Sequence, residues 1–370
     1  MAVQQQLRFV KKERTEFFSV LKKRVDGYFK ENNISKYGNQ TLTIKAIALV
    51  SIYILPLLAI LTFNPPFWVA LLLWAVSGFG MAGCGMSVMH DANHGSWSAN
   101  AKVNKRVAGV LHLLGGSCIN WKIQHNLLHH TYTNIVTHDE DIQDRLVLKF
   151  NPHTAVRWYH PFQYIYAFFF YGLMTFYWVT LKDIVQYFKF IKLGANTQSP
   201  AENRKLLGGI ILNKIGYFSI MIIAPILVWH IPALQIIGGF MLMHFVGGII
   251  LTITFQLAHT LEGTSHPLGD EKGIVENDWA IHQLNTTINF STKNKFFTWY
   301  MGGLNYQVEH HLFPRISHVH YPALAPIVKA TAEEYGVPYL ENETFAKAFK
   351  DHVTALKSFG HVPSLNEAIA

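Results

Sequence analysis

The sequence predicts an all-α integral membrane protein whose four transmembrane helices form two hairpins, with interfacial helices and a cytosolic helical cap. Half of the 370 residues are apolar and only 15% are charged, whereas about a quarter of the residues in an average soluble domain are charged. Two long segments, residues 46–90 and 215–261, contain no Asp, Glu, Lys or Arg. The 20 histidines predict that the cap carries a metal site.

Each charge-free segment accounts for one hairpin. Each is about twice the roughly 20 residues that cross a bilayer as a helix. Each is also broken near its middle, by "NPP" at 64–66 and by "HIP" at 230–232, and such residues form turns. The predicted transmembrane helices therefore cover about residues 44–63, 67–89, 208–229 and 233–259.

Charge predicts the orientation of the chain in the membrane. Neither hairpin tip carries a charge, whereas residues 1–42 hold nine Lys or Arg. Cytoplasmic loops are enriched in these residues, so we expect both tips outside and the rest of the chain in the cytosol. The formal net charge of +8 fits nucleic acid or an anionic bilayer surface, and the long uncharged segments favour the bilayer over nucleic acid.

Three domains follow from this organisation. Residues 1–42 are predicted to be a cytosolic basic segment, in which Phe17, Leu21 and Val25 recur at helical spacing among lysines. Such a helix can lie on the membrane surface or pack against the cytosolic part of the protein. Residues 43–340 are predicted to form the membrane domain, and residues 341–370 a cytosolic C-terminal helix.

Residues 161–181 form another uncharged stretch that is long enough to span a bilayer. If it did span, the histidines near residue 125 and those near residue 310 would face opposite compartments and could not share a metal. We therefore predict an interfacial or re-entrant aromatic segment, which leaves four transmembrane helices.

Histidines gather in three clusters on the predicted cytosolic side. Two of the clusters hold histidines at i and i+4, which share one face of a helix. A glutamine, Gln307, precedes the third pair by three residues. The clusters read "HDANHG", "HNLLHH" and "QVEHH", and their histidines are His90, His94, His125, His129, His130, His310 and His311.

These clusters predict a metal centre. A lone histidine is usually a packed or solvated residue, but seven histidines in three clusters at one membrane face are hard to obtain by chance. Neutral imidazole suits iron, zinc, copper or nickel. A structural zinc accepts four ligands, so this number of histidines favours two metal ions. His259, at the predicted cytoplasmic end of the fourth membrane helix, is an eighth candidate ligand.

Residues near the clusters have expected supporting roles. Asp91 and Glu309 stand next to candidate ligands, and each can accept a hydrogen bond from a ligand ring and fix its tautomer. His244 lies fifteen residues before His259 on the same helix, about 22 Å away at roughly 1.5 Å per residue, and is too deep to join. His282 is the remaining histidine that most needs comparison with the structure.

These features resemble the membrane fatty acid desaturases, a family recognised by three such histidine boxes after two hairpins of membrane helices. The form "QVEHHLFP" is similar to the third box of the front-end branch, which begins with glutamine. The likeness extends over about residues 45–340. It implies that the seven box histidines and His259 bind two non-haem iron ions, and that Gln307 replaces a histidine found in other branches.

The resemblance also implies the activity, an O2-dependent oxidoreductase that introduces a cis double bond into a fatty acyl chain carried by CoA or by a lipid. The C–H bonds of an unactivated methylene are neither acidic nor polarised, so oxygen activated on a redox metal must remove the hydrogens. No separate nucleophile or general base is expected. Aromatic and small residues of the membrane helices and of residues 161–181 are expected to shape a bent acyl tunnel.

The electron donor and the compartment follow from the same resemblance. Many eukaryotic front-end enzymes carry a fused cytochrome b5 domain with an "HPGG" haem signature, and this sequence contains no "HPGG". Two electrons are therefore expected from a separate protein, either a ferredoxin or a cytochrome b5 with its reductase. The expected location is the cytoplasmic membrane if the source is bacterial and the endoplasmic reticulum if it is eukaryotic, with a cytosolic active site.

Gln307 has two possible roles at such a site. Its amide oxygen can bind a metal weakly, or it can hold a metal-bound water and leave a position open for oxygen.

Two other functions share part of the pattern. A membrane di-iron hydroxylase or ketolase also has histidine boxes but inserts oxygen, and the "QVEHHLFP" form argues against it. A histidine-rich metal transporter would line its pathway with polar residues inside the membrane, and the two charge-free segments contain almost none.

Overall fold

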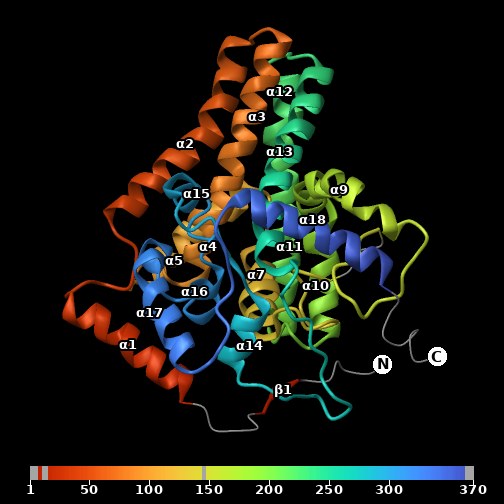
Figure 1. Ribbon diagram of the computed structural model, residues 1–370. Coiled ribbons are helices and arrows are strands. Elements are labelled where there is room, and N and C mark those ends of the chain that lie inside the picture. The colour runs from red at the N-terminus through yellow and green to blue at the C-terminus, as the bar shows by residue number, and fades with distance from the viewer. Residues whose placement is uncertain (1–6, 11–15, 144–146, 363–370) are drawn as a thin grey trace. The chain divides into compact units, whose positions relative to one another are not determined.

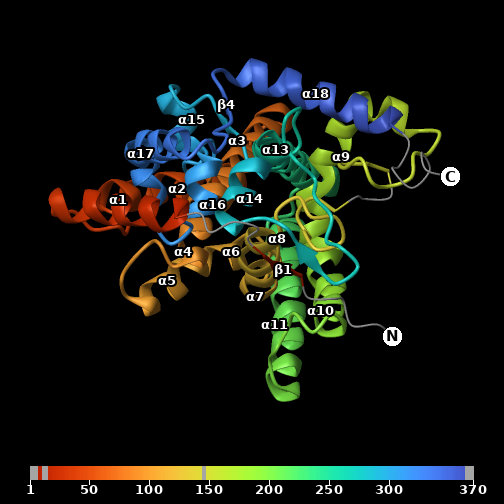
Figure 2. The same cartoon turned by 60° about the horizontal axis from the view of Figure 1, so that its bottom comes forward.

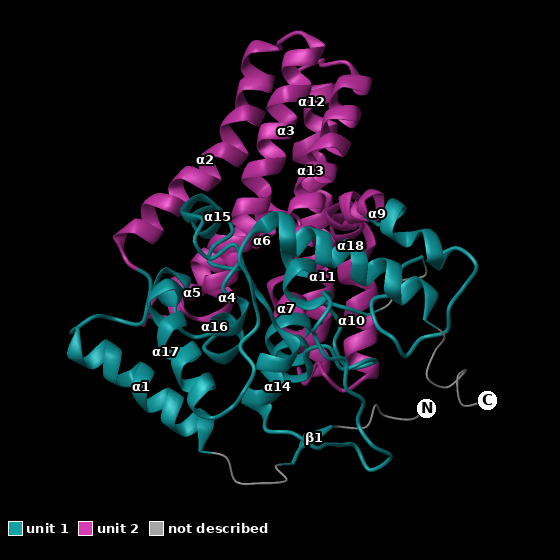
Figure 3. Ribbon diagram, in the orientation of Figure 1, with its two compact units in different colours: residues 1–38, 124–167, 254–370 teal, residues 39–123, 168–253 magenta. Residues whose placement is uncertain are grey.

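The computed structural model describes residues 7–10, 16–143 and 147–362. Most of these residues are helical (Figure 1), as the sequence predicts. The chain forms two compact units, which Figure 3 shows in different colours. Unit 1 comprises residues 1–38, 124–167 and 254–370, and unit 2 comprises residues 39–123 and 168–253.

Among the described residues, five helices are long and apolar enough to cross a membrane. Four of them cover the segments predicted to span, and the fifth contains residues 161–181. The sequence predicts four transmembrane helices, and the structure has one more helix than that which is long and apolar enough to cross a membrane. The five helices are Gln40–Phe63, Phe67–His94, His160–Lys192, Pro200–Leu227 and Ala233–His259.

The helix that contains the third predicted span begins before that span, because its polar start is itself a good helix N-terminus. The Ser199 side chain accepts from the backbone N–H of Glu202, and the Glu202 carboxylate accepts from the backbone N–H of Ser199. This capping box satisfies two amide donors that the first turn of a helix leaves unpaired. The helix therefore begins at Pro200 and not at residue 208.

Unit 2 is built from the membrane segments and the short helices that join them. Helices α9 (Gln163–Tyr177) and α13 (Ala233–His259) have residues in both units. π-helical turns interrupt the long helices at Cys84–Met89, Trp178–Lys182 and Ser219–Ile223. The remaining helices are α2 (Gln40–Phe63), α3 (Phe67–Gly83), α4 (His90–His94), α5 (Ala101–Ala108), α6 (Val110–Leu113), α7 (Cys118–Trp121), α10 (Asp183–Lys192), α11 (Pro200–Phe218) and α12 (Ala224–Leu227).

The first hairpin depends on a close approach of two backbones. Helix α2 ends at Asn64, which adopts the left-handed conformation with φ 40°. The Ser77 hydroxyl of α3 donates to the backbone oxygen of Tyr53 in α2 over 2.7 Å. A Cβ atom on Gly80 would lie 2.3 Å from the backbone nitrogen of Tyr53. Small residues at helix contacts allow such an approach within a membrane.

Unit 1 combines short helices with two parallel two-stranded pairings. Strand β1 (Arg8–Phe9) pairs with β2 (Ile274–Val275), and β3 (Asn289–Phe290) pairs with β4 (Glu341–Asn342). The helices are α1 (Phe17–Glu31), α8 (His130–Tyr132), α14 (Trp279–Thr286), α15 (Lys295–Tyr300), α16 (Gln307–Leu312), α17 (Tyr321–Glu334) and α18 (Phe345–His361). Parts of both predicted terminal segments, residues 1–6, 11–15 and 363–370, lie outside the described residues.

The apolar face of helix α1 packs against protein. Figures 1 and 2 show it beside α17, and its residues Phe17, Leu21 and Val25 are buried in the core of unit 1. The Arg24 guanidinium donates to Glu334 of α17 over 2.6 Å. Amphipathic spacing alone does not distinguish a lipid from a protein partner, and the second of the two alternatives left open by the sequence is the one observed.

Replacing Gly80 with Ala is expected to destabilise the hairpin, because the new methyl group would meet the backbone of Tyr53 at 2.3 Å. Overpacking of this kind costs about 1–3 kcal/mol. Thermal unfolding of the purified protein in detergent should show a lower midpoint for the variant.

Gly238→Ala is the matched control, because a Cβ atom there has no neighbour within 4 Å and Ala favours a helix more than Gly does. Its unfolding midpoint should stay unchanged or rise. Equal midpoints for both variants would contradict the close packing at Gly80.

Candidate metal centre

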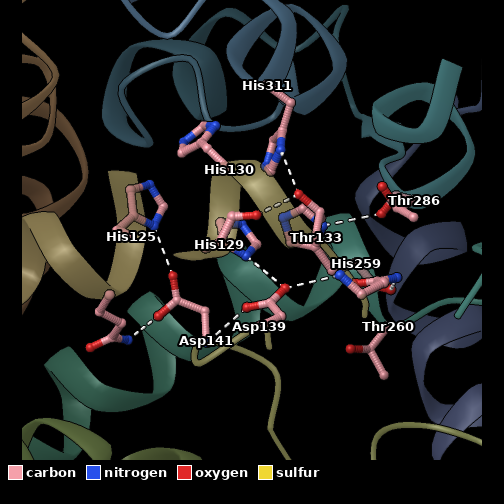
Figure 4. Close-up of polar contacts among 12 residues, drawn as sticks. His125, His129, His130, Thr133, Asp139, Asp141, His259, Thr260, Thr286 and His311 are labelled. Atoms are coloured by element: carbon pink, nitrogen blue, oxygen red, sulfur yellow. Dashed lines mark hydrogen bonds and ion pairs between the residues drawn. The ribbon is translucent and has the colours of Figure 1, made fainter. Parts of the chain in front are cut away.

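Six of the eight predicted ligand histidines lie in unit 1, and all six are buried. Figure 4 shows five of them in close-up. They come from three separate parts of the chain, which the fold of this unit brings together. A π-helical turn (Lys122–His129) carries His125 and His129, α8 begins with His130, α13 ends with His259, and α16 carries His310 and His311.

The π-helical turn is a departure from the α-helix that the sequence predicts. The rings of His125 and His129 are stacked, with centroids 5.1 Å apart. In a π-helix each turn contains more residues than in an α-helix, and such turns occur often at functional sites. The stacked rings show that residues at i and i+4 still lie on one face of this π-helical turn.

Two groups of three histidines form around His311. The ring of His311 lies with its centroid 4.9 Å from that of His129 and 4.9 Å from that of His259. On its other side it lies 4.4 Å from the ring of His130. One nitrogen of each ring in the set His129, His259 and His311 lies within 4.8 Å of the others, and the same holds for the set His130, His310 and His311.

Two carboxylates hold two of the three histidines of the second cluster. The Nδ1 of His129 lies 2.9 Å from Asp139, and the Nδ1 of His125 lies 2.8 Å from Asp141. Figure 4 shows these two aspartates beneath their histidines. Asp139 also accepts from the backbone N–H groups of Asn134 and Asp141, both at 2.9 Å. Because three N–H groups point at its two oxygens, Asp139 is held as a carboxylate acceptor.

Electrostatics differ between the histidines. Burial disfavours the charged form of His129, but Asp139 and Asp141 outweigh that effect and raise its pKa above the ordinary value. Burial lowers the pKa of His311 well below the ordinary value, and the neighbouring histidines lower it further. The ring of His311 is therefore neutral at physiological pH.

The ring nitrogens of three histidines fit a metal ion. The Nδ1 of His259 donates to the backbone oxygen of Thr286 over 3.2 Å, and the Nδ1 of His311 donates to the Gln283 side-chain oxygen over 2.8 Å. The opposite nitrogen, Nε2, has no hydrogen-bond partner in His129, His259 or His311 among the described residues. A buried polar atom without a partner is costly, and a metal ion would use these lone pairs.

Comparison with known proteins points to one family. The sequence matches the family described as fatty acid desaturase over residues 66–342. It is 34% identical over 349 residues to the sn-1 linoleoyl-lipid 6-desaturase of Arthrospira platensis, covering 94% of this chain and 93% of that protein. The protein of the same name from Synechocystis sp. is 35% identical over 348 residues, covering 93% and 95%. The acyl-lipid (8-3)-desaturase of Physcomitrium patens is 32% identical over 360 residues, covering 96% and 74%.

The chain belongs to the fatty acid desaturase family. It is an integral membrane oxidoreductase of the front-end type, as the "QVEHH" box predicts. The family implies non-haem iron, and the histidine groups of the desaturase are candidates to hold it.

The first histidine cluster lies in unit 2. His90 and His94 are the first and last residues of α4, and their ring centroids are 4.6 Å apart. Both rings meet the edge or face of Trp121 at 5.5 Å. Asp91, which follows His90 in the sequence, is buried. Its backbone oxygen accepts from the Ser96 N–H over 3.0 Å. Its predicted contact with a ligand ring remains a prediction.

The third cluster is fixed in place by a buried network that involves Glu309. Asn289 donates to one carboxylate oxygen of Glu309 over 2.8 Å, and the Tyr339 hydroxyl donates to the other over 2.9 Å. The Asn289 side-chain oxygen accepts from the backbone N–H of Val308 over 2.9 Å. The two oxygens of Glu309 thus bind Asn289 of β3 and Tyr339, which lies two residues before β4. The sequence suggests instead that Glu309 accepts from a histidine ring. Burial raises the pKa of Glu309 to about 7.

Gln307 and the remaining histidines are placed as follows. Gln307 is buried at the first position of α16, one turn before His310 and His311. His244 of unit 2 is bonded to Tyr217 and Thr175 at 3.0 and 3.1 Å. His282 is buried with its ring 5.0 Å from that of Phe9, and among the described residues it joins none of the histidine groups.

Asp139 and Asp141 are site residues that the sequence prediction missed. They stand two residues apart in "HDEDIQD", and this spacing lets one short loop reach two histidines that are four residues apart. An acidic pair soon after a histidine cluster was the available signal. Neither aspartate is adjacent to a candidate ligand, whereas adjacency selected Asp91 and Glu309.

Replacing Asp139 with Asn should weaken metal binding, because an amide nitrogen would face one of the three N–H donors that point at this side chain. Loss of such a supporting acceptor typically lowers metal affinity by about 10–100-fold. Iron per folded chain, measured after dialysis against a weak chelator, should fall.

The exposed Glu262 supplies the matched control, Glu262→Gln, which should keep the iron of the wild-type protein. An Asp139 variant with wild-type iron affinity would show that this carboxylate does not support the ligand.

Proposed function

We propose that this desaturase introduces a cis double bond into lipid-linked fatty acyl chains, between an existing double bond and the carboxyl end. The proposal is supported by the names of the Arthrospira, Synechocystis and Physcomitrium relatives, which are acyl-lipid enzymes. It is also supported by their coverage of more than nine-tenths of this chain. An acyl-CoA substrate is the alternative to be tested.

We further propose that two iron ions are the cofactors, bound by eight histidines. The observation that carries this proposal is the set of buried Nε2 atoms on His129, His259 and His311 that lack a hydrogen-bond partner. Iron bound there would supply the redox chemistry with O2 that an unactivated C–H bond requires. The proposed ligands are His90, His94, His125, His129, His130, His259, His310 and His311, with Gln307 as a weak ligand or a holder of bound water.

The protein residues of unit 1 then have defined tasks. Asp139 and Asp141 orient two of the ligand rings. The ring of Phe255 lies 5.0 Å from that of His129 and 4.9 Å from that of His259, so it covers them with an apolar surface and excludes water. No side chain of the site is required to act as a nucleophile or a general base.

We propose that four helices span the membrane, with both hairpin tips outside and the active site in the cytosol. The helix His160–Lys192 would then lie at the interface. This is supported by the charges in its second half, Lys182, Asp183, Lys189 and Lys192. With four spans, the three histidine clusters fall on the same side.

The two electrons would come from a separate ferredoxin or a cytochrome b5 with its reductase.

The function is tested by expressing the full chain in a host that lacks polyunsaturated lipids and supplying defined acyl chains. Mass spectrometry should locate a new double bond on the carboxyl side of an existing one, first in intact lipids and not in the acyl-CoA pool. Hydroxylated products without new double bonds would contradict the desaturase and favour the hydroxylase alternative.

Replacing Gln307 with Ala should lower turnover while most of the iron stays bound, because the proposed role is weak ligation or the holding of a water. Turnover and iron content are measured on the same preparation. Unchanged turnover would contradict both roles of Gln307.

A further inference from the structure

Gln283 of α14 lies at a junction between the second and third histidine clusters. Its side chain is fully buried in unit 1. The side-chain oxygen lies 2.8 Å from the Nδ1 of His311 and 2.9 Å from the Thr133 hydroxyl. The side-chain nitrogen donates to the backbone oxygen of His130 over 3.3 Å. One amide therefore contacts both the second cluster, through the backbone of His130, and the third cluster, through the ring of His311.

These contacts determine how the amide is oriented. The backbone oxygen of His130 can only accept a hydrogen bond, so the nitrogen of Gln283 must face it. The oxygen then faces His311 and can only accept in turn. His311 must therefore carry its proton on Nδ1, which leaves the lone pair on Nε2. That Nε2 atom is buried and has no hydrogen-bond partner among the described residues.

We propose that Gln283 is a positioning residue for the metal centre, which sets the tautomer and the orientation of His311 through a neutral acceptor. This inference rests on the proposed iron site. Its effect is transmitted through His311, which shares candidate metal groups with His129 and His259 and with His130 and His310. A substitution at Gln283 would therefore alter metal binding by both groups, because both contain the ring of His311.

The contact with His311 is the part of the Gln283 network that other groups replace least well. The backbone oxygen of His130 has a second donor, because the Trp279 indole N–H lies 3.1 Å from it. The Thr133 hydroxyl has a second acceptor, the backbone oxygen of His129 at 2.7 Å. Among the described residues, only Thr133, at 3.3 Å from the Nδ1 of His311, offers another oxygen to that nitrogen, and at a longer distance than Gln283 does.

The neutral amide also distinguishes His311 from its neighbour His129. A carboxylate partner, as Asp139 is for His129, makes the ring a stronger electron donor to a bound metal. An amide oxygen does so less, since it carries no net charge. Gln283 thus keeps His311 a weaker donor than His129, with which it shares one candidate metal group.

The test compares Gln283→Leu with Gln283→Glu. Leucine keeps the approximate volume but removes every hydrogen bond, whereas glutamate keeps an oxygen that can accept from His311 and loses the donor to His130. The control is Gln163→Leu, because Gln163 is also buried in unit 1 and holds three backbone groups of Lys149 and Leu356 at 2.7–3.0 Å. The readouts are iron per folded chain and the electronic absorption spectrum of the iron-loaded protein.

Gln283→Leu should bind iron about 10–100-fold more weakly, as expected for loss of a supporting group. Gln283→Glu should recover most of the iron but with a shifted spectrum, because a carboxylate would then face His311. Gln163→Leu should lower thermal stability and keep both the wild-type iron ratio and the wild-type spectrum.

Three outcomes would overturn the proposal. Gln283→Leu could keep wild-type iron and spectrum, Gln283→Glu could lose as much iron as Gln283→Leu, or Gln163→Leu could reproduce the spectral change. Absence of iron from the wild-type chain would instead overturn the iron site itself, and this inference with it. If Gln283→Leu does not fold, Thr133→Val replaces it. That variant should hold less iron than Thr133→Ser, and equal iron in the two would overturn the proposal.

Discussion

The structure of unit 1 depends on one constraint, the burial of six histidines whose rings lie within a few ångströms of one another. Buried imidazoles are polar groups that need partners on both ring nitrogens. Protein acceptors take one nitrogen, as Asp139 does for His129 and Gln283 does for His311. The Nε2 atoms of His129, His259 and His311 have no protein partner among the described residues. A bound metal ion would resolve that deficit.

Much of the surrounding fold serves to hold these rings. The loop of residues 139–141 reaches two histidines of one π-helical turn. Helix α14 supplies Trp279 and Gln283, which both donate to the backbone oxygen of His130. The pairing of β3 with β4 places Asn289 and Tyr339 around Glu309. The aspartates come from a loop soon after their histidines, whereas Trp279 and Gln283 are about 150 positions from His130, so part of the support forms only when the chain folds.

The sequence predicted the parts of this protein that have a local signature. Charge-free segments indicated the apolar helices, and the histidine spacing selected eight residues, of which six gather in unit 1. Asp139 and Asp141 had a weak local signature as an acidic pair soon after a histidine cluster. Gln283 had none, because it is separated from His311 by 28 positions and becomes a neighbour only through folding. Helix α1 shows the same limit, since an apolar stripe indicates burial but does not name the partner. The fifth apolar helix, His160–Lys192, shows that length and hydropathy do not by themselves determine which helices cross a membrane.

If the histidine cluster holds a pair of iron ions, Mössbauer spectroscopy of the purified full-length chain, loaded with the Mössbauer isotope of iron, should detect them. We expect two iron ions per chain in nitrogen-rich surroundings. We also expect the signal to be lost when His129, His259 and His311 are replaced together. An iron content below one per chain in fully loaded protein, or a spectrum that survives this triple replacement, would show that the cluster does not hold an iron pair.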